Sequence, residues 1–406
     1  MSSKKKTTGT KEDAKPLLPK LRFPEFREAE EWDADDLGTV ADFVNEKIPV
    51  GRVSLENYFS TENILSDYGG VARASKLPTT GSVTRFRPND TLVSNIRPYL
   101  KKVWTADKDG GASNDVIVIR AKQRLLPQYL SSLLKNDAFI DYMMTGAKGV
   151  KMPRGDVDSM KGYLASYPTK AEQQKIAECV SSIDEVVAAQ ARKVDALKAH
   201  KKGLMQQLFP REGESRPRLR FPEFKNDGEW QQRTLADACN MQAGKFVAAA
   251  DIKEQDADEL FPCYGGNGLR GFTATHTHDG VFPLIGRQGA LCGNVKLATG
   301  RFHATEHAVV ATPNRSIEVV WLYYLLDLLN LNRFATGQAQ PGLSVDVLEK
   351  VPVTIPDEEL EQHRIAACLS RLDALIAAAT QRLDAFKRHK RGLMQQLFPA
   401  WEGAEV

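Results

Sequence analysis

Histidine, cysteine and acidic side chains are the usual carriers of catalysis and metal binding, and here their spacing matches no such site. His276 and His278 lie near Cys263 and Cys292 in the sequence, but this is not the spacing of a compact zinc motif. The chain contains no HExxH, no GxxxxGKS/T phosphate loop, and no GxGxxG that opens a helix after a strand. The sequence therefore predicts a protein that is not an enzyme, with no metal and no cofactor of its own.

Loops rich in arginine, lysine, asparagine and glutamine beside glycine are a second kind of candidate site, because these side chains bind phosphates and base edges. Two loops lie at matched places in the two halves of the chain: residues 95–99 and 285–289 each follow a strand-like run. Residues 147–155 and 337–344 each lie between a helix and the last strand. For any single residue, a solvated surface side chain remains the alternative. The candidate DNA-binding residues are Asn95, Arg97, Tyr99, Lys101, Lys102, Lys148, Lys151 and Arg154 in the first half, and Asn267, Arg270, Arg287, Gln288, Gln338 and Gln340 in the second.

These loops belong to a chain that is duplicated. Residues 176–210 recur as residues 365–399, with identical residue types at 20 of 35 positions, and both copies end in GLMQQLFP. The motif LRFPEF opens each half, at residues 21–26 and 219–224. Such an internal repeat sets the architecture of the whole chain. Each half is therefore one unit, made of an anchor motif, a variable domain and a long helix.

The repeated segment has the pattern of a coiled-coil helix. Apolar residues recur at alternating steps of four and three from Ile176 and again from Ile365, which is the average period of 3.5 of a coiled-coil seam. We expect the two seams to pack against each other. Thr169 and Glu172 have the spacing of a capping box at the first helix. The duplicated glutamines beyond the seam serve either the fold or a partner protein: Gln206, Gln207, Gln395 and Gln396.

Composition places few further limits on the protein. The chain has 406 residues and a formal net charge of +3, so DNA binding would depend on local clusters of cations. Its five scattered cysteines favour reduced thiols in a cytosol. No apolar run reaches the length of a membrane span.

The variable domains read as small α+β folds. Strand-like runs at 91–96 and 116–120, and at 281–286 and 307–312, precede helical runs at 125–144 and 317–331. We expect two small α+β domains held apart by two long antiparallel coiled-coil helices. The expected ranges are 1–20 for a basic flexible arm, 21–168 for the first domain, 169–210 for its helix, 211–218 for a linker, 219–356 for the second domain, 357–399 for its helix, and 400–406 for a tail.

Several motifs together carry a family resemblance. YGGNGLRG (264–271), LIGRQGALCGNV (284–295), TGQAQPGLS (336–344) and the doubled GLMQQLFP resemble the DNA-specificity subunit of Type I restriction–modification systems. The resemblance covers nearly the whole chain beyond the N-terminal arm. The first variable domain departs more, since it has RPYLK and KGVKMPRG where the second has GRQGA and GQAQPGLS.

The resemblance implies that each target-recognition domain reads one half of a bipartite site in double-stranded DNA. It also implies that the helices bind two methyltransferase subunits, and that two motor and endonuclease subunits join the complex. S-adenosylmethionine, ATP and magnesium would then belong to the partner subunits. Two alternatives remain open: a coiled-coil scaffold whose variable domains bind proteins, and a metal-dependent nuclease, which the absence of its motifs disfavours.

Overall fold

The computed structural model describes residues 18–289, 291–337 and 341–399. The chain divides into two compact units, residues 1–192 with 381–406 and residues 193–380. The divisions fall inside the two long helices, so each unit contains one α+β domain and parts of both helices. The domain ranges proposed from the sequence remain predictions.

Unit 1 begins with short strands and helices that wrap around two small sheets. One sheet has the strand order β2-β9-β6-β7 and the other β3-β5-β8-β4, while β1 pairs separately with β10. Its elements are η1 (Pro24–Phe26), β1 (Asp33–Asp36), α1 (Leu37–Val40), β2 (Ala41–Phe43), β3 (Lys47–Pro49), η2 (Val50–Arg52), β4 (Tyr58–Phe59), β5 (Ser82–Phe86), β6 (Thr91–Ser94), η3 (Pro98–Leu100), β7 (Val103–Thr105), β8 (Gly110–Ala112), β9 (Val116–Ala121), α2 (Pro127–Leu134), α3 (Asp137–Thr145), α4 (Val157–Lys161), β10 (Leu164–Tyr167) and the first part of α5 (Lys170–Leu208).

Unit 2 repeats this plan with one larger sheet. Six strands have the order β12-β17-β15-β16-β13-β14, and β11 pairs separately with β18. Its elements are η4 (Pro222–Phe224), β11 (Gln231–Thr234), α6 (Leu235–Ala238), β12 (Cys239–Ala243), η5 (Ala249–Asp251), β13 (Phe261–Gly265), β14 (Gly268–Thr273), β15 (His278–Gly286), β16 (Val295–Ala304), β17 (Ala308–Pro313), α7 (Val319–Leu328), η6 (Leu331–Phe334), α8 (Val345–Leu348), β18 (Pro352–Ile355) and the first part of α9 (Glu359–Leu397).

The expected α+β class is confirmed, and the expected strands and helices are present in both units. The helical run expected at 125–144 forms two helices, α2 and α3. Asn136 separates them and accepts the Ala138 N–H with its side chain, which is the usual role of an N-cap residue.

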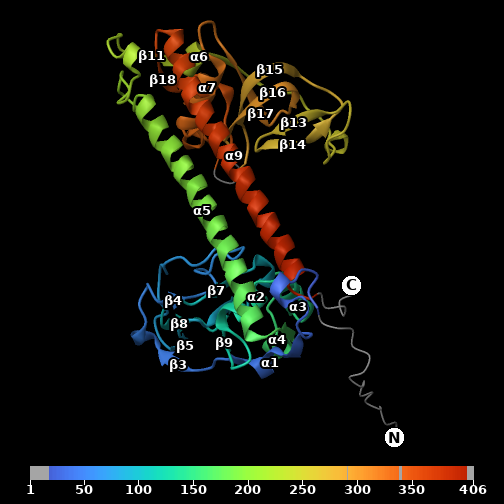
Figure 1. The fold of residues 1–406 in the computed structure, drawn as a ribbon. Coiled ribbons are helices and arrows are strands. Elements are labelled where there is room, and N and C mark those ends of the chain that lie inside the picture. Colours follow the sequence, from blue (N-terminus) through green and yellow to red (C-terminus); the bar gives the residue numbers. More distant parts are fainter. Residues whose placement is uncertain (1–17, 290, 338–340, 400–406) are drawn as a thin grey trace. The chain divides into compact units, whose positions relative to one another are not determined.

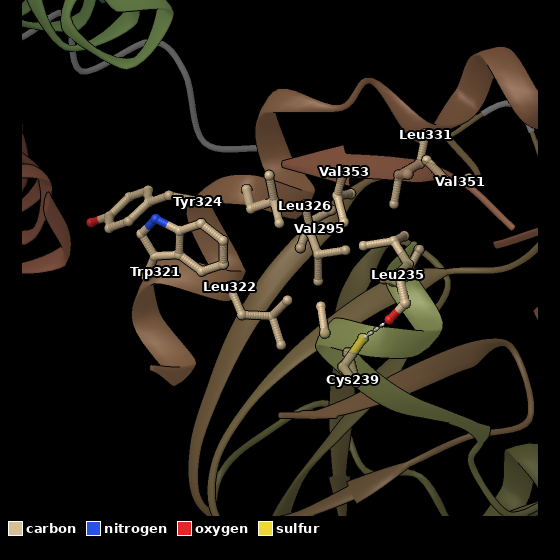
Figure 2. Close-up of a cluster of buried hydrophobic side chains, with 14 of the residues drawn as sticks. Leu235, Cys239, Val295, Trp321, Leu322, Tyr324, Leu326, Leu331, Val351 and Val353 are labelled. Carbon is tan, nitrogen blue, oxygen red and sulfur yellow. Dashed lines mark hydrogen bonds between the residues drawn. The ribbon is translucent and has the colours of Figure 1, made fainter. Parts of the chain in front are cut away.

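Each unit has a core in which aromatic rings join the variable domain to the long helices. In unit 2, Phe209 lies 5.9 Å from Trp321, and Trp230 lies 6.2 Å from Trp321. Figure 2 shows Trp321 and Leu322 of α7 near Val295 of β16. Unit 1 uses the same plan, since the ring centroid of Phe398 lies 5.6 Å from that of Tyr129 in α2. Burial of such large rings supplies much of the stability of a small domain.

The long helices pair in antiparallel fashion within each unit. In unit 1, α5 begins beside the variable domain and meets the end of α9, and in unit 2 α9 begins beside the other variable domain (Figure 1). Lys390 binds Asp184 at 2.5 Å in unit 1, and Lys201 binds Asp373 at 2.6 Å in unit 2. The residue numbers of both pairs sum to 574, so both units use one register. Gly203 lies inside α5.

The repeated LRFPEF motif fastens the start of each domain to its own long helix. Arg22 donates two hydrogen bonds of 2.8 Å to the carboxylate of Glu172, and Arg220 donates two of 2.7 Å to Glu361. Both carboxylates are almost fully buried. This geometry is the strong two-pronged form of the arginine–carboxylate pair. The carboxylate of Glu172, expected to cap the helix, instead binds Arg22.

Candidate nucleic-acid interface

Two loops of unit 1, distant in sequence, are joined by backbone hydrogen bonds. The first follows β6, and the second lies between α3 and α4. The Arg97 N–H donates to the Pro153 carbonyl at 2.8 Å, and the Gly155 N–H donates to the Asn95 carbonyl at 3.0 Å. We call this pair of loops, residues 95–99 and 147–155, the first loop pair.

The second loop of this pair is a closed hairpin with an exposed tip. Lys148 and Arg154 exchange two backbone hydrogen bonds of 2.9 Å, and Gly149 has a φ of +96°, which favours glycine. The stem is thus fixed by hydrogen bonds, while residues 150–152 extend into solvent. A tip presented on such a stem is suited to binding, because little further ordering is needed.

Unit 2 contains the same arrangement. The Gly289 N–H donates to the Pro341 carbonyl at 3.0 Å, and the Leu343 N–H donates to the Arg287 carbonyl at 2.9 Å. Thr336 and Gly342 exchange two hydrogen bonds of 2.9 Å. We call residues 285–289 with 335–344, as far as they are described, the second loop pair.

These hydrogen bonds define which residues correspond between the units. The N–H of Asn95 binds the carbonyl of Asp115 at 2.8 Å, directly before β9, and the N–H of Arg287 binds the carbonyl of His307 at 2.9 Å, directly before β17. The hairpin loops correspond at a constant offset of 188 residues. The equivalent pairs are therefore Asn95 with Arg287, Arg97 with Gly289, Lys148 with Thr336, Pro153 with Pro341, and Arg154 with Gly342.

Arg97 occupies a backbone position that favours glycine. Its φ is +52°, and the equivalent Gly289 has a φ of +86°. A left-handed backbone conformation is unfavourable for an arginine. Backbone energetics alone would therefore favour glycine at position 97. Such strain at an exposed loop is a common feature of binding sites.

The predicted DNA-binding residues around the first loop pair fall into two groups. The members of the first group are exposed: Arg97, Tyr99, Lys148, Lys151 and Arg154. The pKa of Lys148 is raised because its ammonium donates a hydrogen bond to the carboxylate of Asp156.

Lys101 and Lys102, in contrast, turn inward. Lys101 binds the Asp137 carboxylate at 2.5 Å, and Lys102 donates to the Thr61 carbonyl at 2.5 Å. Both side chains are half-buried. In this conformation the two lysines stabilise the loop. The structure therefore does not support the expectation that they contact DNA. Asn95 is also buried, and its side-chain oxygen has no hydrogen-bond partner among the described residues.

Three segments of unit 2 meet at the second loop pair. Gly266 lies in the turn between β13 and β14. Its carbonyl oxygen would be only 1.9 Å from a Cβ atom placed on Gly286, so the two backbones approach closely. This turn brings exposed Asn267 and the nearby strand residue Arg270 to the region of Arg287. Arg287 is half-buried, and no hydrogen bond or ion pair holds its guanidinium among the described residues.

The remaining candidates of unit 2 are less well defined. Gln288 is exposed and forms an isolated bridge with Gly342. Gln338 and Gln340 lie outside the described residues. Sequence reasoning missed the acids that pair with the loop cations, such as Asp115, which binds Arg154 at 2.8 Å. No sequence signal would have linked these two residues.

The residues considered for a metal site do not form one. Within the described ranges, no group of histidine, cysteine and acidic residues is arranged to hold a metal ion. Of these residues, His278 has its Nδ1 atom 2.8 Å from the hydroxyl of Thr277. None of the described helices is both long and apolar enough to cross a membrane.

The duplicated MQQLF segments divide their residues between the fold and the surface. The methionine, leucine and phenylalanine of each copy are buried, whereas Gln206, Gln207, Gln395 and Gln396 are exposed. The backbone carbonyls of Gln207 and Gln396 accept the N–H groups of Leu219 and Leu21 at 2.9 Å. The glutamine side chains are thus free to meet a partner, while the backbone holds the anchor motif.

Comparison with known proteins finds a family that part of the chain matches. Residues 227–388 match the family described as Type I restriction modification DNA specificity domain. The specificity subunit of the Type I restriction enzyme EcoprrI of Escherichia coli is 42% identical over 160 residues, which are 39% of this chain and 40% of that protein. The match thus spans about two fifths of that relative. The specificity subunit of the Type I restriction enzyme MjaVIII of Methanocaldococcus jannaschii is 22% identical over 92% of this chain and 93% of its own length.

Solved structures share the fold over most of the chain. The crystal structure of the Type I restriction–modification S subunit from M. genitalium covers 95% of this chain and 100% of its own, with a TM-score of 0.64 and 17% identity. A chain from a structural study of complex assembly and conformational transition in the type I R-M system has a TM-score of 0.54 at 19% identity, over 91% of this chain and 98% of its own. Residues 227–388 are therefore similar to the Type I restriction–modification DNA specificity domain, and over most of its length the chain shares the fold of the solved S subunits.

Proposed function

We propose that this chain gives a Type I restriction–modification complex its DNA sequence specificity, with each unit reading one half of a bipartite, asymmetric site. The observation that carries this proposal is that both units build the same loop pair from different side chains. Phosphate contacts position a protein on DNA, whereas base contacts specify the sequence. Two domains that recognise different sequences can therefore share one backbone arrangement and differ in their side chains.

The side chains of the loop pairs suit duplex DNA. Arg97, Lys151 and Arg287 have no acidic partner among the described residues, so their charges are available to phosphates or to guanine edges. The chain's formal net charge is only +3, and affinity would therefore come from these local cations. Binding by cations displaces the counterions of DNA and weakens as salt rises.

The proposed protein partners would bind the long helices. Two methyltransferase subunits would dock on α5 and α9, with Gln206 and Gln207 contacting one and Gln395 and Gln396 the other. Two motor and endonuclease subunits would join through the complex. This chain would supply no cofactor, whereas the partner subunits would carry S-adenosylmethionine, ATP and magnesium.

A binding selection tests the proposal directly. The chain, purified with its methyltransferase subunits, is incubated with a random duplex library, and the bound DNA is sequenced at two salt concentrations. We expect two short specified blocks separated by unspecified bases, with affinity that falls as salt rises. Recovery of unselected DNA, or of none, with a partner protein bound to the variable domains, would favour the scaffold alternative.

A further inference from the structure

The tip of the hairpin in the first loop pair carries apolar side chains in full contact with solvent. Val150 is 99% exposed and Met152 is 55% exposed. The stem below them is fixed by the mutual hydrogen bonds of Lys148 and Arg154. Exposed apolar residues held on an ordered stem are well placed to be buried by a partner, because their burial is favourable and little ordering is required.

The surroundings of this tip indicate an anionic partner. Lys151 lies between the two apolar residues in the sequence and has no acidic partner among the described residues, whereas the flanking Lys148 and Arg154 pair with Asp156 and Asp115. Arg97 is held against the same hairpin through the Pro153 carbonyl. Since phosphates neutralise such cations while the major groove offers apolar groups, duplex DNA fits this mixture of charge and apolar surface.

The equivalent hairpin of unit 2 has a different chemistry at the same positions. The constant offset of 188 residues aligns Val150 with Gln338 and Met152 with Gln340, although these glutamines lie outside the described residues. An amide binds the hydrogen-bonding edge of adenine, whereas an apolar side chain contacts the methyl group of thymine. The sequence thus has two apolar residues between Gly149 and Pro153, where it has two glutamines between Gly337 and Pro341.

We propose that Val150 and Met152 read thymine methyl groups in the major groove of the first half-site. This inference rests on the proposed function, since it assigns a base to residues of a DNA-reading loop. It makes Val150 and Met152 specificity-determining residues that act by burial of a methyl group and form no hydrogen bond to the base.

Deoxyuridine provides the test, because it pairs as thymidine does but lacks the methyl group. Each thymine of the selected site is replaced in turn by deoxyuridine, and affinity is measured for the full chain with its methyltransferase subunits. We expect at least one replacement in the first block to weaken binding about fourfold, the fold-change equivalent of ~0.8 kcal/mol for one methyl group removed from water.

Two alanine variants then connect that thymine to the hairpin. With Val150→Ala or Met152→Ala, the deoxyuridine penalty at that position should disappear, while replacements in the second block keep their effect. The control is Val281→Ala, an exposed valine on β15 outside the loop pairs, which should leave all penalties unchanged.

The outcomes separate this inference from the function beneath it. A first block without thymine, no deoxyuridine penalty in that block, or a penalty that persists in both alanine variants would overturn the inference and leave bipartite reading intact. Loss of all sequence-selective binding by the wild-type complex would overturn the proposed function as well.

Discussion

A fragment of residues 1–213 should form a two-fold dimer, because unit 1 takes part of its core from the end of α9. Met394, Leu397 and Phe398 are buried in unit 1, and a chain that ends at residue 213 lacks them. Full burial of each such side chain is worth about 1.5–3 kcal/mol. Their loss thus removes roughly 5–9 kcal/mol as an upper estimate, comparable with the whole stability of a typical domain, about 5–15 kcal/mol.

The fragment carries its own replacement for these side chains. Met205, Leu208 and Phe209 stand 189 positions earlier and fill the same role in unit 2. Lys201 likewise corresponds to Lys390, and could bind Asp184 of a second copy. Each copy would complete the core of the other, as expected for a two-fold interface.

Mass in solution and thermal unfolding provide the assay. We expect the fragment to be a dimer whose melting temperature rises with protein concentration. Phe209→Ala in the fragment should weaken the dimer, whereas exposed Gln207→Ala should not. With methyltransferase subunits, the dimer should methylate a palindrome built from the first half-site. A stable folded monomer at micromolar concentration, or methylation of the original asymmetric site, would refute the interchange of the two helix ends.

Three further predictions concern the helices and their anchors. Arg220→Met should destabilise unit 2 by about 3–5 kcal/mol in chemical unfolding, because it leaves the buried carboxylate of Glu361 without its cation. The double variant Arg220→Met with Glu361→Leu should recover much of that stability, and an equal loss in both variants would contradict a stabilising ion pair. Burial raises the pKa of the Cys239 thiol to about 12, and the thiolate is the form that reacts. Cys239 should therefore resist alkylation at pH 8 in the native protein and react once the protein unfolds, whereas rapid labelling of the native protein would contradict its burial. A seam of about 33 residues spans ~50 Å at 1.5 Å per residue, so the half-sites should lie no more than about 15 base pairs apart, and a longer gap in the selected DNA would contradict this limit.

The duplicated architecture was accessible from the sequence because repetition and period are local properties. The steps of four and three from Ile176 predicted α5, and the matched positions of the loops predicted corresponding loops in both halves. That the two loops of one unit are joined by backbone hydrogen bonds was not predicted. The polar residues around Arg287 were found for the same reason, since arginine beside glycine is visible without coordinates.

The long-range pairings were not accessible in this way. Arg22 and Glu172 are 150 residues apart, and nothing in either neighbourhood links them. Lys101 and Lys102 looked equivalent to Lys148 and Lys151, yet the first two bind Asp137 and the Thr61 carbonyl. Whether a surface lysine is free depends on which distant groups the fold brings to it, and composition does not record that.

Methylation mapping at single-base resolution tests the central claim, that each unit reads its own block of DNA. A host that expresses the chain with its methyltransferase subunits is compared with hosts that carry Arg97→Ala or Arg287→Ala. If Arg287 reads a base, its loss should weaken binding by about 1–3 kcal/mol and relax the methylated sequence only in the second block, while Arg97→Ala affects only the first. Relaxation of both blocks by either variant, or a single continuous methylated site in the wild type, would contradict reading by two independent loop pairs.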